Sequence, residues 1–175
     1  PWGHSALDLR GRGGHDSRDR ASPQMIDTHL LLPDAQATDA AGRALGGVLC
    51  AGDVIALSGD LGAGKTSLAR GLLAELGLMD EAPSPSFALV IPYAPPQVRL
   101  PVWHVDLYRL NDPAEAEELG LEDALFDGAL LIEWPERLNW LWPETLALHI
   151  SVSPDGTRGL TAKVPPSWKD RWPLS

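Results

Sequence analysis

The sequence predicts an α/β fold, in which helices flank a mixed, partly parallel sheet. The stretch Gly59–Thr66 reads Gly-Asp-Leu-Gly-Ala-Gly-Lys-Thr and matches the phosphate-binding pattern G-x-x-x-x-G-K-[ST] at every fixed position. It lies between an apolar run over 53–58, typical of a buried strand, and a helical pattern over 67–76. Several further strand patterns follow one another without a helix between them, which predicts a mixed sheet.

The stretch Gly59–Thr66, hereafter the phosphate loop, indicates a single P-loop NTPase domain that binds a nucleotide. Its glycines let backbone N–H groups approach phosphate oxygens that side chains would hold away. The following helix directs the partial positive charge of its N-terminus at the same phosphates. We expect Lys65 to reach the β and γ phosphates and the Thr66 hydroxyl to ligate Mg²⁺. A glycine-rich turn before an ordinary helix is the competing interpretation.

The remaining elements follow from apolar periodicity and from their stop signals. Pro33 stops the first strand, Thr38 or Asp39 can cap the first helix, and Gly77 ends the helix after the phosphate loop. The segment 83–86 reads as a rigid linker. The further predicted strands cover 28–32, 87–91, 101–106, 129–133, 146–152 and 160–164. The further predicted helices cover 39–50, 113–118 and 121–126.

Three segments differ in composition. Residues 1–24 are rich in Gly, Arg, Ser and Asp, which predicts a disordered or non-native N-terminal extension. A basic nucleic-acid-binding arm is the alternative, although this segment has a net charge of only +1. Residues 25–165 are predicted to form the P-loop ATPase domain. Residues 166–175 form a C-terminal tail, rich in proline and tryptophan, that we expect to lie loosely on the surface.

The composition limits the classes of partner. The chain has 175 residues and a formal net charge of −10, so an acidic body of this kind is a poor nucleic-acid binder on its own. The single cysteine, Cys50, fits a reducing compartment, and its apolar neighbours predict a buried structural thiol. No apolar run approaches the ~20 residues that span a bilayer, and no secretory signal is recognisable. We therefore expect a cytoplasmic protein without membrane or DNA partners.

Two carboxylates, Asp106 and Glu133, end apolar strands. Ligands gather at the carboxyl ends of strands in open α/β sheets, so both side chains would face a bound metal and the γ-phosphate. Ser86 could contact the γ-phosphate or metal as a switch, or be an ordinary turn residue. His104 shares a strand face with Asp106; a core or partner contact is favoured over a metal or acid–base role.

Two surface features leave alternatives open. The chain has seven tryptophans, and Trp140 and Trp142 could either pack on a sheet face or expose an apolar patch to a partner. An acidic strip is either a solvated helix face or a docking surface for a basic partner. Its members are Asp112, Glu115, Glu117, Glu118, Glu122, Asp123 and Asp127.

The order of the motifs resembles the TsaE family, the small ATPases of bacterial tRNA threonylcarbamoyladenosine biosynthesis. The resemblance covers about residues 28–164. Its most specific parts are the segments 104–110 (His-Val-Asp-Leu-Tyr-Arg-Leu) and 132–136 (Ile-Glu-Trp-Pro-Glu). Its other parts are Leu32-Pro33-Asp34 with Thr38, the phosphate loop and Ser84-Pro85-Ser86-Phe87.

The resemblance implies a cytoplasmic ATPase that binds ATP and Mg²⁺, is slow alone, and works with the TsaD–TsaB complex. That complex modifies adenosine 37 of tRNAs that read codons starting with A, so this chain would meet tRNA only indirectly. By similarity, Lys65, Asp106 and Glu133 are catalytic, and Thr66 and Glu133 hold the metal. The implied nucleotide contacts are Gly59, Asp60, Leu61, Gly62, Ala63, Gly64, Lys65, Thr66, Ser67, Ser86, Asp106, Trp134, Arg158, Ala35 and Thr38.

The chain departs from the family pattern at two positions. Ser86 stands where the family usually has Thr, which keeps the hydroxyl and loses a methyl, and Ser67 stands where a second Thr is common. Two other functions remain as alternatives. A stand-alone small-molecule kinase would add a mobile lid with arginines over the phosphates, and no such lid is evident here. A nucleotide-gated interaction module would bind ATP tightly without turning it over.

Overall fold

The computed structural model describes residues 24–175. The predictions for residues 1–23 therefore lie outside the described residues. Over the described range, none of the helices combines the length and apolar character that crossing a membrane requires.

Seven strands form one mixed sheet in the order β1-β7-β6-β2-β5-β4-β3. The strands are β1 (Ile26–Leu32), β2 (Val54–Ser58), β3 (Val90–Tyr93), β4 (Val102–Asp106), β5 (Ala129–Glu133), β6 (Leu146–Val152) and β7 (Arg158–Val164). Strands β4, β5, β2 and β6 are mutually parallel, whereas β7 runs antiparallel to β6 and β1, and β3 runs antiparallel to β4. The predicted fold class, an α/β domain with a partly parallel sheet, is confirmed.

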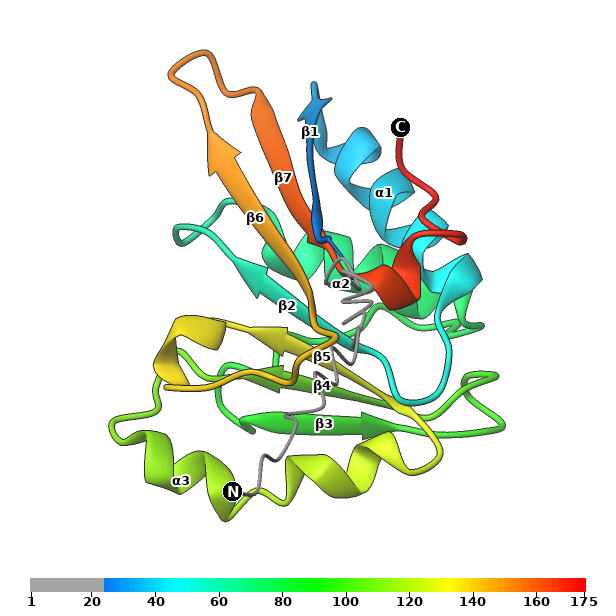
Figure 1. Ribbon diagram of the computed structural model, residues 1–175, viewed down its shortest axis with the longest axis vertical. Helices are drawn as coiled ribbons and strands as arrows, with labels where there is room; N and C mark the ends of the chain where they lie inside the picture. The colour runs from blue at the N-terminus through cyan, green and yellow to red at the C-terminus, as the bar shows by residue number, and fades with distance from the viewer. Residues whose placement is uncertain (1–23) are drawn as a thin grey trace, which may run out of the picture.

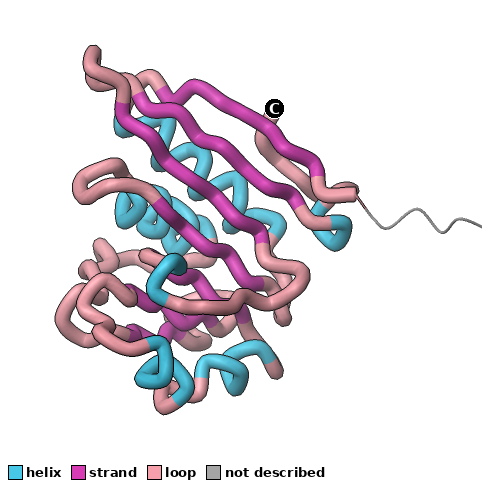
Figure 2. Tube along the Cα trace, turned by 60° about the vertical axis from the view of Figure 1, so that its left-hand side comes forward, coloured by secondary structure: helices cyan, strands magenta, loops and turns pink. Residues whose placement is uncertain are grey.

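Helices lie on both sides of this sheet. They are α1 (Ala35–Val48), α2 (Lys65–Glu75), α3 (Pro113–Glu117) and the 3-10 helices η1 (Leu121–Leu125), η2 (Pro135–Arg137) and η3 (Pro166–Trp168). Helices α1 and α2 cover one face together, and α3 and η1 lie at the β3–β5 end of the other face (Figure 1). Figure 2 shows the strands of the β1–β2 half with the two long helices behind them.

The first helix begins earlier than the sequence predicted. Its cap is Asp34, whose side chain accepts a hydrogen bond of 2.8 Å from the Ala37 N–H. The predicted caps Thr38 and Asp39 are wrong, because Thr38 lies one turn inside the helix and is buried. The buried state predicted for Cys50 is also wrong. Helix α1 ends at Val48, so Cys50 lies in the exposed turn that leads to β2.

Glycines bring α1 and α2 into close contact and so fix the position of the phosphate loop. A Cβ atom added at Gly42 would overlap the Leu68 carbonyl of α2, and one added at Gly71 would overlap the Asp39 carbonyl of α1. Backbones that approach this closely leave no room for side chains between them. Because α2 begins at Lys65, so that the last two residues of the phosphate loop form its first turn, the packing of α2 against α1 also positions Lys65 and Thr66.

The predicted strand over 87–91 starts later than expected. Residues 85–88 form a turn, and β3 begins at Val90. Leu89 has φ 62°, a left-handed conformation that is uncommon for a residue other than glycine. Phe87, expected within the strand, is 87% exposed because it lies on this turn. The turn holds Ser84 and Ser86 beside the end of β4.

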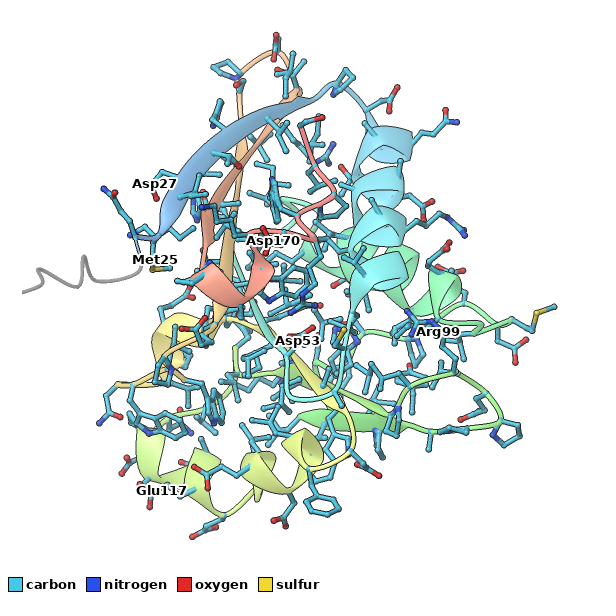
Figure 3. The ribbon with its side chains drawn as sticks, turned by 45° about the vertical axis from the view of Figure 1, so that its right-hand side comes forward. Met25, Asp27, Asp53, Arg99, Glu117 and Asp170 are labelled. Carbon is cyan, nitrogen blue, oxygen red and sulfur yellow. The ribbon has the colours of Figure 1, made fainter. Side chains whose placement is uncertain are left out.

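The C-terminal tail does not lie loosely on the surface. Trp168 is fully buried, and Trp172 and Leu174 pack against the core shared by the sheet and helices α1 and α2. Arg171 forms an ion pair with Asp53, just before β2. Figure 3 labels Asp53 beneath the C-terminal segment that carries Asp170. The prediction failed because the tail is rich in tryptophan, and burying these large side chains stabilises the docked position.

Candidate nucleotide-binding site

The phosphate loop leaves the carboxyl end of β2 and turns tightly into α2. Gly59 has φ 141° and Gly64 has φ 112°, values that side chains rarely allow. A Cβ atom at Gly59 would overlap the Ile150 carbonyl of β6, so only glycine fits there. Helix α2 starts at Lys65, and its first N–H groups have no partner within the helix. The loop therefore presents backbone donors and a helix N-terminus at one point, which suits a phosphate group.

Lys65 lies near the end of the phosphate loop, and its side chain contacts the start of the loop. Its ammonium donates hydrogen bonds to the carbonyls of Gly59, at 2.6 Å, and Asp60, at 2.9 Å. The same nitrogen lies 4.3 Å from the ring centroid of Trp134, a cation–π contact. Burial lowers the pKa of Lys65, and the negative charges of Glu133 and its neighbours oppose that shift. The loop thus holds one partly desolvated cation where a phosphate would bind.

Asp106 and Glu133 come from adjacent parallel strands and occupy matching positions in the register of β4 and β5. Both are buried, with 4% and 2% of their surface exposed. Asp106 accepts one hydrogen bond from the Tyr108 N–H at 2.9 Å and another from the Ser86 hydroxyl at 3.2 Å. The Thr66 hydroxyl lies 3.2 Å and 3.3 Å from the two carboxylate oxygens of Glu133. Both carboxylates line one cavity together with the phosphate loop, which is the position expected of residues that face a metal and the γ-phosphate.

The oxygen atoms at this point form a donor set that fits Mg²⁺. They belong to Thr66, Ser86, Asp106 and Glu133, all hard ligands of the kind that Mg²⁺ prefers. A hydroxyl that donates its hydrogen to a carboxylate keeps its lone pairs for a cation, and Thr66 donates to Glu133. Mg²⁺ in nucleotide sites is typically held by one or two carboxylates together with substrate phosphates. The residues therefore suit a magnesium nucleotide.

Trp134 and Arg158 form the walls of the site. Trp134 has φ 60° and ψ 51°, a left-handed backbone that turns its ring back over Lys65, and Tyr108 packs on it with a centroid separation of 4.8 Å. Arg158, from the start of β7, donates a hydrogen bond of 2.7 Å to the Ala63 carbonyl. That contact holds the guanidinium against the phosphate loop, although 95 residues separate the two in sequence.

These groups surround a cavity of about 220 Å³. Most of the predicted nucleotide contacts line it, together with the predicted metal ligand Glu133, namely Leu61, Gly62, Gly64, Lys65, Thr66, Ser67, Ser86, Asp106, Glu133, Trp134 and Arg158. The other predicted residues do not line it. Gly59, Asp60 and Ala63 contribute loop carbonyls that hold Lys65 and Arg158. Thr38 is buried beside Gly64, and Ala35 is exposed at the start of α1.

Sequence reasoning missed one residue that lines this site. Ser84 lines the cavity, and its hydroxyl lies 2.7 Å from that of Ser86. The alternation Pro-Ser-Pro-Ser was the available signal, because it places both serines on one side of a stiff turn. His104, predicted as a core or partner contact, is fully buried and lies 2.8 Å from Glu133. Its spacing of two from Asp106 was the signal that the two side chains share a strand face.

Beyond this site, Trp140 and Leu141 leave an apolar surface open. They are 39% and 40% exposed and line a groove of about 540 Å³ beside β2 and β6. Trp142 packs edge-on against Trp140, with a centroid separation of 4.7 Å. The acidic strip over 112–127 has all its carboxylate side chains exposed. Both surfaces are available to a partner, and neither geometry identifies one.

Comparison with known proteins agrees with this geometry. The sequence model of the family described as "Threonylcarbamoyl adenosine biosynthesis protein TsaE" matches residues 32–160. The tRNA threonylcarbamoyladenosine biosynthesis protein TsaE of Nostoc sp. is 38% identical over 136 residues, which cover 75% of this chain and 82% of that protein. The protein of the same name from Streptomyces coelicolor is 37% identical over 139 residues, which cover 70% and 94%.

The fold is also similar to a solved structure. The crystal structure of Bacillus subtilis YdiB aligns with a TM-score of 0.68 at 28% sequence identity, covering 86% of this chain and 95% of that one. The family match includes the phosphate loop, both strand-end carboxylates and Arg158. The resemblance inferred from the motifs is thus confirmed, and the chain belongs to the TsaE family.

Proposed function

We propose that this protein is a Mg²⁺-dependent ATPase that supports threonylcarbamoylation of tRNA adenosine 37. The observation that carries the proposal is the convergence of Lys65, Thr66, Asp106 and Glu133 around one cavity at the carboxyl ends of β2, β4 and β5. Positioning and electrostatic stabilisation account for most of the catalysis in phosphoryl transfer, and these residues supply both. Membership of the TsaE family, and the names of the matched relatives, support the pathway.

The residues divide the work by their chemistry. The loop N–H groups and Lys65 bind the β and γ phosphates and offset their negative charge. Thr66 and Glu133 would hold Mg²⁺, which would supply positive charge to offset the charge that develops on the phosphate oxygens. Asp106, fixed through both of its oxygens by Ser86 and Tyr108, is positioned to orient the attacking water. Trp134 covers Lys65 and limits the access of bulk water to it.

The protein partner that we propose is the TsaD–TsaB complex, met in the cytoplasm. The acidic body, with a net charge of −10 over the whole chain, disfavours direct binding of tRNA. A contact with protein partners lets nucleotide turnover influence tRNA modification without a tRNA-binding surface on this chain. The segment 84–88, hereafter the switch turn, carries Ser84 and Ser86 and lies beside Asp106. A partner that moves this turn would change the rate of hydrolysis.

The test is Mg²⁺-dependent ATP hydrolysis by this protein alone and with purified TsaD–TsaB and tRNA. We expect slow turnover alone, faster turnover with the complex, and repeated rounds of tRNA modification only when ATP can be hydrolysed. A hydrolysis rate that ignores the complex, while the complex is otherwise active, would contradict the proposal. Phosphate transfer to a small molecule instead of water would identify the stand-alone kinase, the alternative function.

A further inference from the structure

His104 and Glu133 form a buried pair beneath the phosphate loop. The His104 Nε2 lies 2.8 Å from Glu133 Oε1, and the two residues are 0% and 2% exposed. Burying a carboxylate is costly unless hydrogen bonds compensate it. Glu133 receives one such bond from the Thr66 hydroxyl and one from His104. The second is the shorter of the two, so His104 is the closest support of this carboxylate.

The sheet register places His104 next to Glu133 but out of reach of the nucleotide cavity. His104 pairs with Leu131 across β4 and β5, and Glu133 lies two positions further along on the same face. The imidazole therefore sits behind Glu133, on the side away from the cavity, and it does not line the cavity. It contacts the carboxylate without reaching the position of the nucleotide.

The hydrogen-bond inventory fixes the proton of His104. A carboxylate accepts only, so the nitrogen that faces Glu133 carries the hydrogen. The other nitrogen, Nδ1, is buried without a partner among the described residues. Oε1 of Glu133 thus has His104 at 2.8 Å and the Thr66 hydroxyl at 3.2 Å, whereas Oε2 has only the Thr66 hydroxyl, at 3.3 Å, among the described residues.

We infer that His104 is a positioning residue that orients Glu133 for the metal. Its Nε2–H holds Oε1 from behind, which fixes the orientation of the carboxylate beside the Thr66 hydroxyl and leaves Oε2, which His104 does not contact, for the metal of the nucleotide. The inference rests on the proposed function, because it assigns Glu133 to that metal. Residues that orient a metal ligand typically change metal affinity or activity by about 10- to 100-fold when removed.

Two substitutions of similar polarity separate positioning from packing. In His104→Gln the amide nitrogen reaches the distance of Nε2 from the backbone and can still donate to Glu133. In His104→Asn the amide nitrogen stops at the distance of Nδ1 and cannot. Binding of a fluorescent ATP analogue is titrated with MgCl₂ for each variant, and thermal unfolding checks the fold. We expect His104→Asn to raise the half-saturating Mg²⁺ about tenfold or more. His104→Gln should stay within about threefold, and affinity without Mg²⁺ should change little in both.

If both variants fold and their half-saturating Mg²⁺ rises equally, His104 acts through packing alone and the inference is overturned. A His104→Asn protein with the Mg²⁺ dependence of the unaltered protein would also overturn it. If His104→Asn does not fold, imidazole nitrogen NMR of the unaltered protein decides. A hydrogen on Nε2 whose signal moves in Glu133→Gln supports the inference, and a hydrogen on Nδ1 overturns it. Neither readout needs turnover. A protein that binds Mg²⁺ and the ATP analogue without hydrolysing ATP would therefore contradict the proposed function and leave this inference standing.

Discussion

Buried charged groups lie near both ends of strand β2, and the two ends differ in how those charges are matched. At the amino end, the two oxygens of Asp53 accept hydrogen bonds of 2.6 Å and 2.7 Å from Arg171. The Cys50 N–H donates a third bond at 2.8 Å. The hydrogen bond to Asp53 raises the pKa of Arg171. Each charge at this end meets an opposite charge.

At the carboxyl end, two buried carboxylates have no such match. Asp106 and Glu133 are contacted by hydroxyl, imidazole and backbone N–H groups. Over residues 24–175, neither carboxylate forms an ion pair with a lysine or an arginine. Lys65 is near, but its ammonium hydrogen bonds are to loop carbonyls.

The way the charges are matched assigns the amino end of β2 to stability and the carboxyl end to function. A matched buried pair locks two segments together, and here it ties the C-terminal tail to the start of β2. An unmatched pair of carboxylates is costly in the folded protein and is relieved when a cation arrives with its ligand. We therefore expect substitutions at the amino end to change folding and those at the carboxyl end to change catalysis.

The largest effect on catalysis should come from Lys65→Met. The substitution removes the positive charge that would bind the phosphate groups, and it should reduce ATP turnover by about 100- to 1,000-fold. Because burial already lowers the pKa of Lys65, its removal should not lower the free energy of unfolding. Lys169→Met, at an exposed lysine of the tail, is the control and should turn over ATP normally. Steady-state hydrolysis measures the turnover of the two variants, and thermal unfolding measures their stability. Normal turnover in Lys65→Met would contradict the assignment of the nucleotide site.

The opposite pattern is expected for Arg171→Ala. Breaking a fully buried ion pair costs about 3–5 kcal/mol, and the side chain of Arg171 is 23% exposed, so we expect a loss of roughly 2–3 kcal/mol in the free energy of unfolding. Turnover per folded molecule should not change. Urea unfolding gives the first quantity, and hydrolysis at low temperature gives the second.

The double variant Asp53→Asn with Arg171→Ala is the control for this loss. It removes the uncompensated charge and should recover part of the stability. If Arg171→Ala unfolds like the unaltered protein, or loses turnover while still folded, the division between the two ends of β2 is wrong.

A smaller effect should follow from Glu133→Gln. The amide can still accept a hydrogen bond from Thr66, but it binds Mg²⁺ weakly, so the half-saturating Mg²⁺ should rise about 10- to 100-fold. The control is Glu136→Gln, which makes the same charge change at an exposed carboxylate outside the nucleotide cavity. It should change the half-saturating Mg²⁺ by less than about threefold. Hydrolysis is measured against MgCl₂, with EDTA as the zero. Equal shifts in the two variants would mean that only the overall charge matters.

The site at the carboxyl end could be predicted from the sequence because its residues are either contiguous in the chain or mark the ends of strands. The phosphate loop is contiguous, and Asp106 and Glu133 end apolar runs. In a sheet whose neighbouring strands are parallel, these ends meet at the same edge. The contact of His104 with Glu133 needed the register of β4 against β5, which one sequence does not supply.

The amino end could not be predicted, because its contacts join distant segments. Asp53 and Arg171 are 118 residues apart, and either could have been an ordinary surface charge. Trp168 reads as part of a proline-rich tail, and its burial depends on a hollow formed by α1 and the sheet. The cap of α1 failed for a related reason. Asp34, Thr38 and Asp39 are all good cap residues, so the residue type alone does not choose among them, and the structure uses Asp34.

The smallest effect should separate the two serines of the switch turn. Ser86 donates a hydrogen bond of 3.2 Å to Asp106, whereas Ser84 reaches only Ser86. The bond to Asp106 is longer than the roughly 2.5–3.0 Å usual between oxygens, so we assign it the contribution of a typical hydrogen bond, about 0.5–1.5 kcal/mol, and expect Ser86→Ala to slow hydrolysis about two- to tenfold. Ser84→Ala should slow it less than twofold, and Ser86→Thr, which restores the residue usual in the family, should keep the rate. A rate equally reduced in both alanine variants would mean that the turn acts through its backbone, and that Asp106 does not depend on the hydroxyl.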